Sequence, residues 1–151
     1  MPSRGILLYY AYVDLRDGRR EDVRSWYHGS VHALGLVGRV RVAWDGVNAT
    51  LGGPMADLQR HIEDVRAHPL LGGHDIDFKL CESSGPASSA AVEESKFSGL
   101  VVELVQEVVS LGPAAAHLAS ADLAAPHASP AEFHALLLEA LVIGAEPFAC
   151  A

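Results

Sequence analysis

The segment over residues 38–53, GRVRVAWDGVNATLGG, constrains the fold more than any other part of the chain. Apolar residues alternate with other residues on both sides of the dipeptide Asp45-Gly46. Asp-Gly between two alternating runs is a strong signal for a β-hairpin, because a type I′ turn needs positive φ at both of its central residues. We therefore predict two antiparallel strands joined by a two-residue turn at Asp45-Gly46.

The predicted turn also decides which residues share a face of the hairpin. One face would be apolar and built from three opposed pairs, Trp44 with Val47, Val42 with Ala49, and Val40 with Leu51. The other face would be polar, with Arg39, Arg41, Asn48 and Thr50. A slip of one residue would move every side chain to the opposite face, so this sorting specifies the register.

Apolar periodicity predicts the elements around the hairpin. A Tyr-rich run predicts a strand over 6–13, and strict alternation predicts another over 76–81. Three- and four-residue spacing predicts a helix over 21–34, with the apolar stripe Val23, Trp26, Tyr27, Val31 and Leu34. A second helix would start with Pro54 in its first turn, end at His68-Pro69, and use the stripe Met55, Leu58, Ile62 and Val65. Arg60 and Asp64 have the spacing of an exposed ion pair on this helix.

The last third of the chain is less regular. Residues 83–98 are small and polar and predict a loop. The run over 100–111 fits a strand or a helix, and its β-branched residues favour a strand. Ser129 and Glu132 form a capping box with Pro130 at the first helical position. The order of elements indicates an α+β, ferredoxin-like βαββαβ sandwich with an extra strand and a C-terminal helical tail.

Composition narrows the range of functions. The formal net charge is −8, from 19 acidic and 11 basic residues, which argues against a general binder of polyanions but not against a local basic patch. DNA is therefore not an expected partner. The sequence has no apolar run long enough to cross a membrane. The absence of an evident transit peptide favours a cytoplasmic location, or a chloroplast location for a trimmed plant-type fragment.

No metal or cofactor is expected. The 2 cysteines are too few and too far apart for a disulfide framework or a four-ligand zinc site. His61, His68 and His74 have spacings that match no zinc pattern.

Several of these segments together resemble a known family, the rhodanese-domain-containing proteins that hydroxylate a wobble uridine of tRNA to 5-hydroxyuridine. The block GRVRVAWDGVNATLGGP resembles the family pattern G-[RK]-[IV]-x-[IV]-A-x-[ED]-G-[IV]-N-[GA]-T-[LV]-x-G. Its signature positions are Gly38, Asp45, Gly46, Asn48, Thr50 and Gly53. The segments ILLYYAYVDL, RAHPLL, IDFK, VQEVVSLG and SPAEFHALL lie around it in the family's order.

The resemblance implies an acylphosphatase-like domain over 1–112 that precedes a rhodanese domain and helps to place the RNA. An Ala-rich linker over 113–128 and the start of an incomplete rhodanese-like region over 129–151 would follow. The family's reactive cysteine lies in a rhodanese loop with a downstream Arg, whereas Cys150 is followed here only by Ala151. We therefore assign no catalytic residue and expect no hydroxylase or sulfurtransferase activity from this chain alone. The stretch LVVELVQE is neutral to acidic where the family tends to be basic.

The polar face of the hairpin is the candidate surface for RNA. Arginine forks suit phosphate oxygens, so Arg39 and Arg41 could contact the RNA backbone, with Asn48 and Thr50 beside them. Tyr10 or Tyr12 of the first strand could add a stacking surface for a base. Two alternatives remain. The polar residues could form a solvated outer face of the hairpin, and the tyrosines could be buried with their hydroxyls hydrogen-bonded inside the protein.

The sequence is also compatible with two other functions. The acidic balance is compatible with a protein-interaction module that docks a rhodanese domain or another protein. A stand-alone acyl phosphatase could use Asn48 with Arg16, Arg19 or Arg20 to bind an acyl phosphate. The segment LRDGRRED, however, lacks the glycine-rich phosphate loop that such enzymes use.

Overall fold

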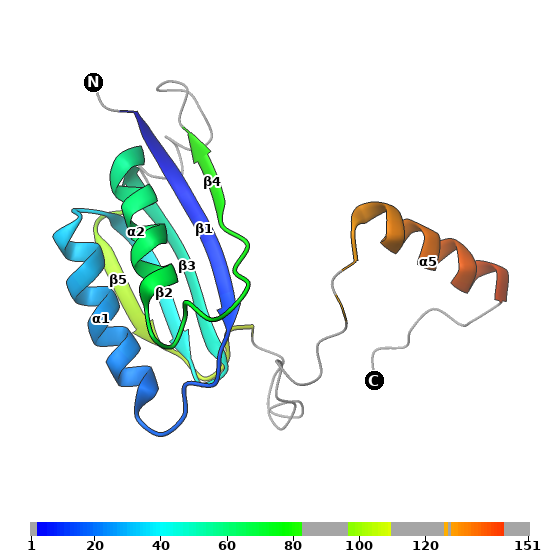
Figure 1. Ribbon diagram of the computed structural model, residues 1–151, viewed down its shortest axis with the longest axis horizontal. Coiled ribbons are helices and arrows are strands. Elements are labelled where there is room, and N and C mark those ends of the chain that lie inside the picture. Colours follow the sequence, from blue (N-terminus) through cyan, green and yellow to red (C-terminus); the bar gives the residue numbers. More distant parts are fainter. Residues whose placement is uncertain (1–2, 83–96, 110–125, 127, 144–151) are drawn as a thin grey trace.

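The computed structural model describes residues 3–82, 97–109, 126 and 128–143. Its elements in chain order are β1 (Arg4–Tyr12), α1 (Arg19–Ala33), β2 (Val37–Ala43), β3 (Gly46–Pro54), α2 (Met55–Ala67), β4 (Lys79–Glu82), β5 (Leu100–Leu104) and α5 (Pro130–Ile143). The five strands form one sheet in the order β4-β1-β3-β2-β5. Figure 1 shows α1 and α2 side by side on the same face of that sheet.

The sheet topology confirms the predicted fold class. β1 is antiparallel to both β3 and β4, and β2 is antiparallel to β3, so the elements from β1 to β4 form the βαββαβ unit of ferredoxin-like folds. β5 adds the predicted extra strand, parallel to β2. No helix within the described ranges has the length and hydropathy needed to span a bilayer.

The hairpin forms, but its turn is one residue earlier than predicted. The loop is Trp44-Asp45, because Ala43 pairs with Gly46, Val42 with Val47, and Val40 with Ala49. Neither loop residue has positive φ, since Asp17 is the only described non-glycine residue that does. The type I′ prediction is therefore wrong.

Gly46 lies in β3 and not in the turn. It opens β3 with a φ of 148°, and a Cβ at this position would overlap the carbonyl oxygen of Ala11 in β1. Only glycine fits so close to a neighbouring strand in this conformation. The glycine therefore belongs to the strand that follows the turn.

Despite this shift, all but one of the residues predicted on the apolar face lie on the buried face of the sheet. The new pairing displaces the register by two residues, and a displacement of two preserves the alternation of side chains between faces. Val40, Val42, Val47, Ala49 and Leu51 are all 0% exposed. Trp44 is the exception: it lies in the turn and is 37% exposed, so its predicted place on the buried face is wrong.

The helices cover the buried face as predicted. From the two stripes, Val23, Tyr27, Val31, Leu58 and Val65 are fully buried, while Trp26, Leu34, Met55 and Ile62 are partly buried against the same core. α2 begins one residue after Pro54, which is its N-cap and not its first helical residue. The predicted Arg60–Asp64 ion pair is present at 3.2 Å.

The later elements are mostly as predicted. β4 is shorter than expected, because only residues 79–82 pair with β1, although Ile76 and Phe78 still pack against the core. The strand prediction for the run after residue 99 is confirmed over β5. The capping box of α5 is also confirmed: Ser129 N donates to Glu132 Oε2 at 2.7 Å, and Glu132 N donates to Ser129 Oγ at 3.3 Å. Most of the expected loop over 83–98 and linker over 113–128 lies outside the described residues.

Candidate functional site

The sheet face opposite α1 and α2 brings the predicted site residues together. In the central row, β1 places Tyr10 beside Asn48 of β3, and β2 places Arg41 on the other side of Asn48. The next row has Leu8, Thr50 and Arg39 in the same three strands. We call this surface the open face and define it by Tyr10, Tyr12, Arg39, Arg41, Asn48 and Thr50.

The polar centre of the open face is a shallow hollow of about 170 Å³. It is lined by Arg39, Arg41, Asn48 and Thr50. Guanidinium, amide and hydroxyl groups are the side-chain donors that proteins use for phosphate and sugar oxygens of nucleic acids. The hollow therefore has the chemistry for an anionic, hydrogen-bonding ligand.

The aromatic part of the open face lies on β1. Tyr10 is 56% exposed, so the alternative that it is a buried tyrosine is wrong. Its ring meets that of Tyr12 edge to face, with the centroids 5.7 Å apart. Burial, together with the nearby carboxylate of Asp45, raises the pKa of Tyr12 above its ordinary value. An exposed aromatic ring on a sheet face that also carries arginines suits the stacking of an unpaired base.

The two arginines of the open face have different surroundings. Arg41 forms an ion pair with Glu103 of β5, with Nε and Oε2 3.9 Å apart. Arg39 lies opposite Val101 in the same strand pairing. Within the described ranges Arg39 forms no ion pair. Arg39 is thus the less neutralised of the two cations.

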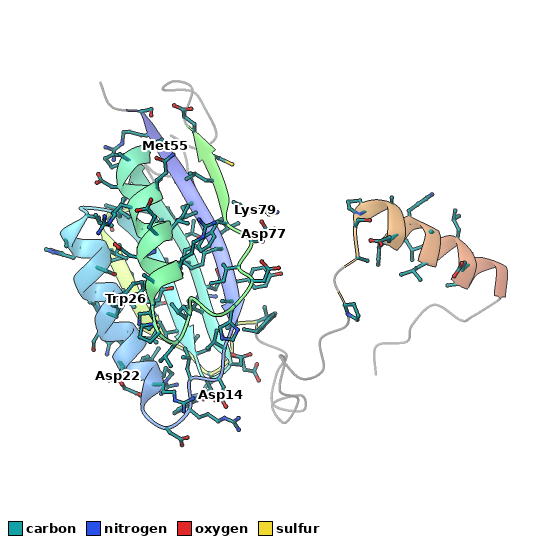
Figure 2. The ribbon with its side chains drawn as sticks, in the orientation of Figure 1. Asp14, Asp22, Trp26, Met55, Asp77 and Lys79 are labelled. Atoms are coloured by element: carbon teal, nitrogen blue, oxygen red, sulfur yellow. The ribbon has the colours of Figure 1, made fainter. Side chains whose placement is uncertain are left out.

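The arginines considered for an acyl-phosphate site lie in the β1–α1 loop and at the start of α1. Asp14 lies in this loop (Figure 2) and accepts hydrogen bonds from Arg16 Nε at 2.8 Å and Nη2 at 2.6 Å, which hold the pKa of the carboxyl well below its usual range. Arg20 stacks on Trp44, 3.6 Å from the ring centroid, and donates to the carbonyl of Val105 at 3.3 Å. Asn48 lies on the open face. Two of the three candidate arginines are therefore held by other partners.

The signature residues divide into two groups. Asn48 and Thr50 line the hollow of the open face. Asp45, Gly46 and Gly38 shape the hairpin: Asp45 Oδ1 accepts a hydrogen bond from Val108 N at 2.9 Å, and a Cβ at Gly38 would overlap the carbonyl oxygen of Thr50. Asp45 and Gly46 thus lie at the turn, whereas Gly38 lies at the far end of the hairpin, opposite Leu51. A Cβ at the remaining signature residue, Gly53, would overlap the side chain of Leu36.

Asp45→Ala tests this structural role. The variant leaves the part-buried N–H of Val108 without its acceptor, which should lower the free energy of unfolding by about 1–2 kcal/mol. Urea denaturation followed by tryptophan fluorescence would measure the loss. Asp75→Ala, which removes an exposed carboxylate, is the matched control and should change stability by less than about 0.5 kcal/mol. Equal stabilities for the two variants would contradict the assignment.

The sequence reasoning missed a buried polar cluster formed by Tyr9, Tyr27 and His61. The Tyr9 hydroxyl is 2.9 Å from the Tyr27 hydroxyl and 2.9 Å from His61 Nε2. All three side chains are 1% exposed or less. Burial lowers the pKa of His61 to about 4, so this imidazole is neutral at pH 7. Trp26 stacks over the His61 ring, with centroids 6.0 Å apart.

The three histidines considered for a metal site do not gather. His61 belongs to the tyrosine cluster, and His68 Nδ1 accepts a hydrogen bond from Leu70 N at 3.2 Å. No group of three or more His, Cys, Asp or Glu side chains in the described part of the chain is arranged to hold a metal ion.

Comparison with known proteins agrees with the resemblance. Residues 4–108 match the family model described as the UPF0176 acylphosphatase like domain. Rhodanese-like domain-containing protein 6 of Arabidopsis thaliana is 37% identical over 138 residues, which cover 90% of this chain and 23% of that protein. The tRNA uridine(34) hydroxylase of an Arthrobacter species is 32% identical over 112 residues, which cover 74% of this chain and 33% of that protein. The chain thus spans a third or less of the length of these two relatives.

Solved structures support the fold alone. The dark-state structure of BlrB, a BLUF protein, superimposes with a TM-score of 0.52 at 21% identity and covers 93% of this chain and 98% of its own. Identity this low carries no argument about function. The family match extends over more than half of the sequence, from the first strand to the segment after β5. The chain therefore belongs to the UPF0176 acylphosphatase-like domain family, whose relatives include tRNA uridine(34) hydroxylases and a rhodanese-like domain-containing protein.

Proposed function

We propose that this chain is an accessory domain that positions RNA for a rhodanese-type tRNA uridine hydroxylase and has no activity alone. Relatives that share the domain are named tRNA uridine(34) hydroxylase, and the matched region is about a third of such a relative. No residue of the described ranges is assigned a catalytic role. Cyanide-dependent consumption of thiosulfate by the purified chain would contradict the proposal.

The open face is the observation that supports this function. Arg39 and Arg41 follow each other on one face of β2, roughly 7 Å apart along the strand at about 3.4 Å per residue. That spacing lets two guanidinium groups contact successive phosphates of a nucleic acid strand. Tyr10 lies one strand beyond Asn48 and offers its ring to a base. Phosphate contacts, hydrogen bonds and stacking are therefore combined on the sheet face that α1 and α2 do not cover.

Removal of both arginines should weaken binding of tRNA strongly. We expect the Arg39→Ala, Arg41→Ala double variant to raise the Kd at least about tenfold and to reduce the slope of log K against log salt by roughly one to two units. A gel-shift or anisotropy titration at 50 and 200 mM salt would measure both quantities. Binding by the wild type should itself weaken as salt rises, because the phosphate contacts of the two arginines release counterions from the RNA.

A second double variant controls for the loss of charge. Arg24 and Arg60 are exposed on α1 and α2, which cover the other face of the sheet. Their replacement by alanine changes the net charge equally and should leave the Kd for tRNA within about twofold. Equal weakening by the two double variants would show that binding follows net charge and not the open face. No binding of tRNA by the wild type at either salt concentration would contradict the proposed function and favour a protein partner.

A further inference from the structure

β5 brings an acidic side chain to the open face. β5 is parallel to β2, and the pairing sets Glu103 directly beside Arg41 and Val101 beside Arg39. Glu103 and Arg41 are both partly exposed, at 43% and 49% of their side chains. The carboxylate therefore lies at the edge of the same surface on which the two arginines gather.

The ion pair between Glu103 and Arg41 is loose. The distance from Nε to Oε2 is 3.9 Å, which is too long for a hydrogen bond. An exposed pair of this kind stabilises a fold little. Its effect on an incoming phosphate is larger, because the phosphate must replace the carboxylate at Arg41 and also approach a like charge.

We infer that Glu103 weakens phosphate binding at the open face. Its carboxylate competes with phosphate for Arg41 and leaves Arg39 as the principal phosphate contact. This inference rests on the proposed function, since it assumes that RNA phosphates meet the face. A carboxylate placed beside a binding arginine disfavours every polyanion that brings charge alone. Ligands that also stack on Tyr10 and bond to Asn48 retain further contacts. Glu103 therefore lowers the affinity of the open face for phosphate and makes the face more selective for ligands that carry bases.

Neutralisation of Glu103 should strengthen binding. We expect Glu103→Gln to lower the Kd of the full chain for tRNA about three- to tenfold at low salt, and the gain should shrink as salt rises. Glu63 is exposed on α2, on the helix-covered side. Glu63→Gln makes the same change in net charge and should alter the Kd by less than about twofold. Equal tightening by the two variants would overturn the inference, because it would assign the effect to net charge.

Single arginine variants test whether Glu103 acts through Arg41. Arg39→Ala should weaken binding more than Arg41→Ala, because Arg41 is already partly neutralised in the wild type. In an Arg41→Ala background, Glu103→Gln should lose most of its effect, which is the non-additivity expected of a pair in contact. If Glu103→Gln had its full effect in the absence of Arg41, the inference that Glu103 acts through Arg41 would be overturned.

The outcomes separate this inference from the proposed function. Binding of tRNA could depend on Arg39 and Arg41 and yet be unchanged by Glu103→Gln. That result would overturn the role of Glu103 and leave the RNA role intact. Absence of binding by the wild type and by Glu103→Gln at every salt concentration would overturn both. Inorganic polyphosphate is a second probe without bases, and Glu103→Gln should tighten its binding more than that of tRNA. Equal or smaller tightening for polyphosphate would overturn the selectivity.

Discussion

Tyr9→Phe is expected to lower the free energy of unfolding by about 2–4 kcal/mol. The variant removes one oxygen atom, but that hydroxyl bonds to both Tyr27 and His61 in the closed core between the sheet and the helices. Its loss leaves two buried polar groups without this partner, and each such group costs about 1–3 kcal/mol. Urea denaturation would measure the change, with the fluorescence of Trp26 as a local probe because its ring contacts both Tyr27 and His61.

Two further variants show whether the Tyr9 hydroxyl is the centre of the cluster. Tyr27→Phe removes the end of the hydrogen-bonded chain and leaves the bond between Tyr9 and His61, so its cost should be about 1 kcal/mol. Tyr10→Phe, one residue along on the exposed face of β1, should change stability by less than about 0.5 kcal/mol. A cost for Tyr27→Phe as large as that for Tyr9→Phe would contradict this organisation.

The hairpin shows what the sequence could and could not predict. The faces of residues 40–51 were predicted correctly apart from Trp44, because alternation in a strand depends only on neighbours in the chain. The position of the turn was not, because Asp-Gly also suits a type I turn in which glycine is the last of the four residues. In the structure Gly46 follows the two loop residues and closely approaches β1, a contact that is not a local property of the sequence.

The site residues divide in the same way. Arg39, Arg41, Asn48 and Thr50 could be grouped from the sequence because one hairpin carries them all. Glu103 could not be placed beside Arg41, since parallel pairing of β5 with β2 joins segments far apart in the chain.

The buried cluster of Tyr9, Tyr27 and His61 could not be predicted from the sequence either, because it combines one side chain each from β1, α1 and α2. His61 is polar, so the apolar stripe that predicted α2 did not include it. Its signal was the helical position one turn from both Leu58 and Val65, which places it on the same face of α2.

The burial of His61 should make the stability of the fold depend on pH. Its pKa is lowered from 6.5 to about 4 by burial, so the unfolded chain binds a proton more readily than the folded chain between these pH values. The contribution of His61 is therefore fully present above about pH 6.5 and is lost as the pH falls toward 4. A shift of this size corresponds to about 3 kcal/mol between pH 7 and pH 4.

Urea denaturation of the wild type and of His61→Gln at pH 7, 6, 5 and 4 would isolate this contribution. Glutamine keeps a polar group near the Tyr9 hydroxyl but does not titrate, so the stability of the variant should fall less steeply with acid. Other groups, such as His68, whose pKa burial also lowers, titrate in both proteins and cancel in the difference. Parallel stability curves from pH 7 to pH 4 would show that the imidazole is protonated without cost, which a closed core around Tyr9, Tyr27 and Trp26 does not allow.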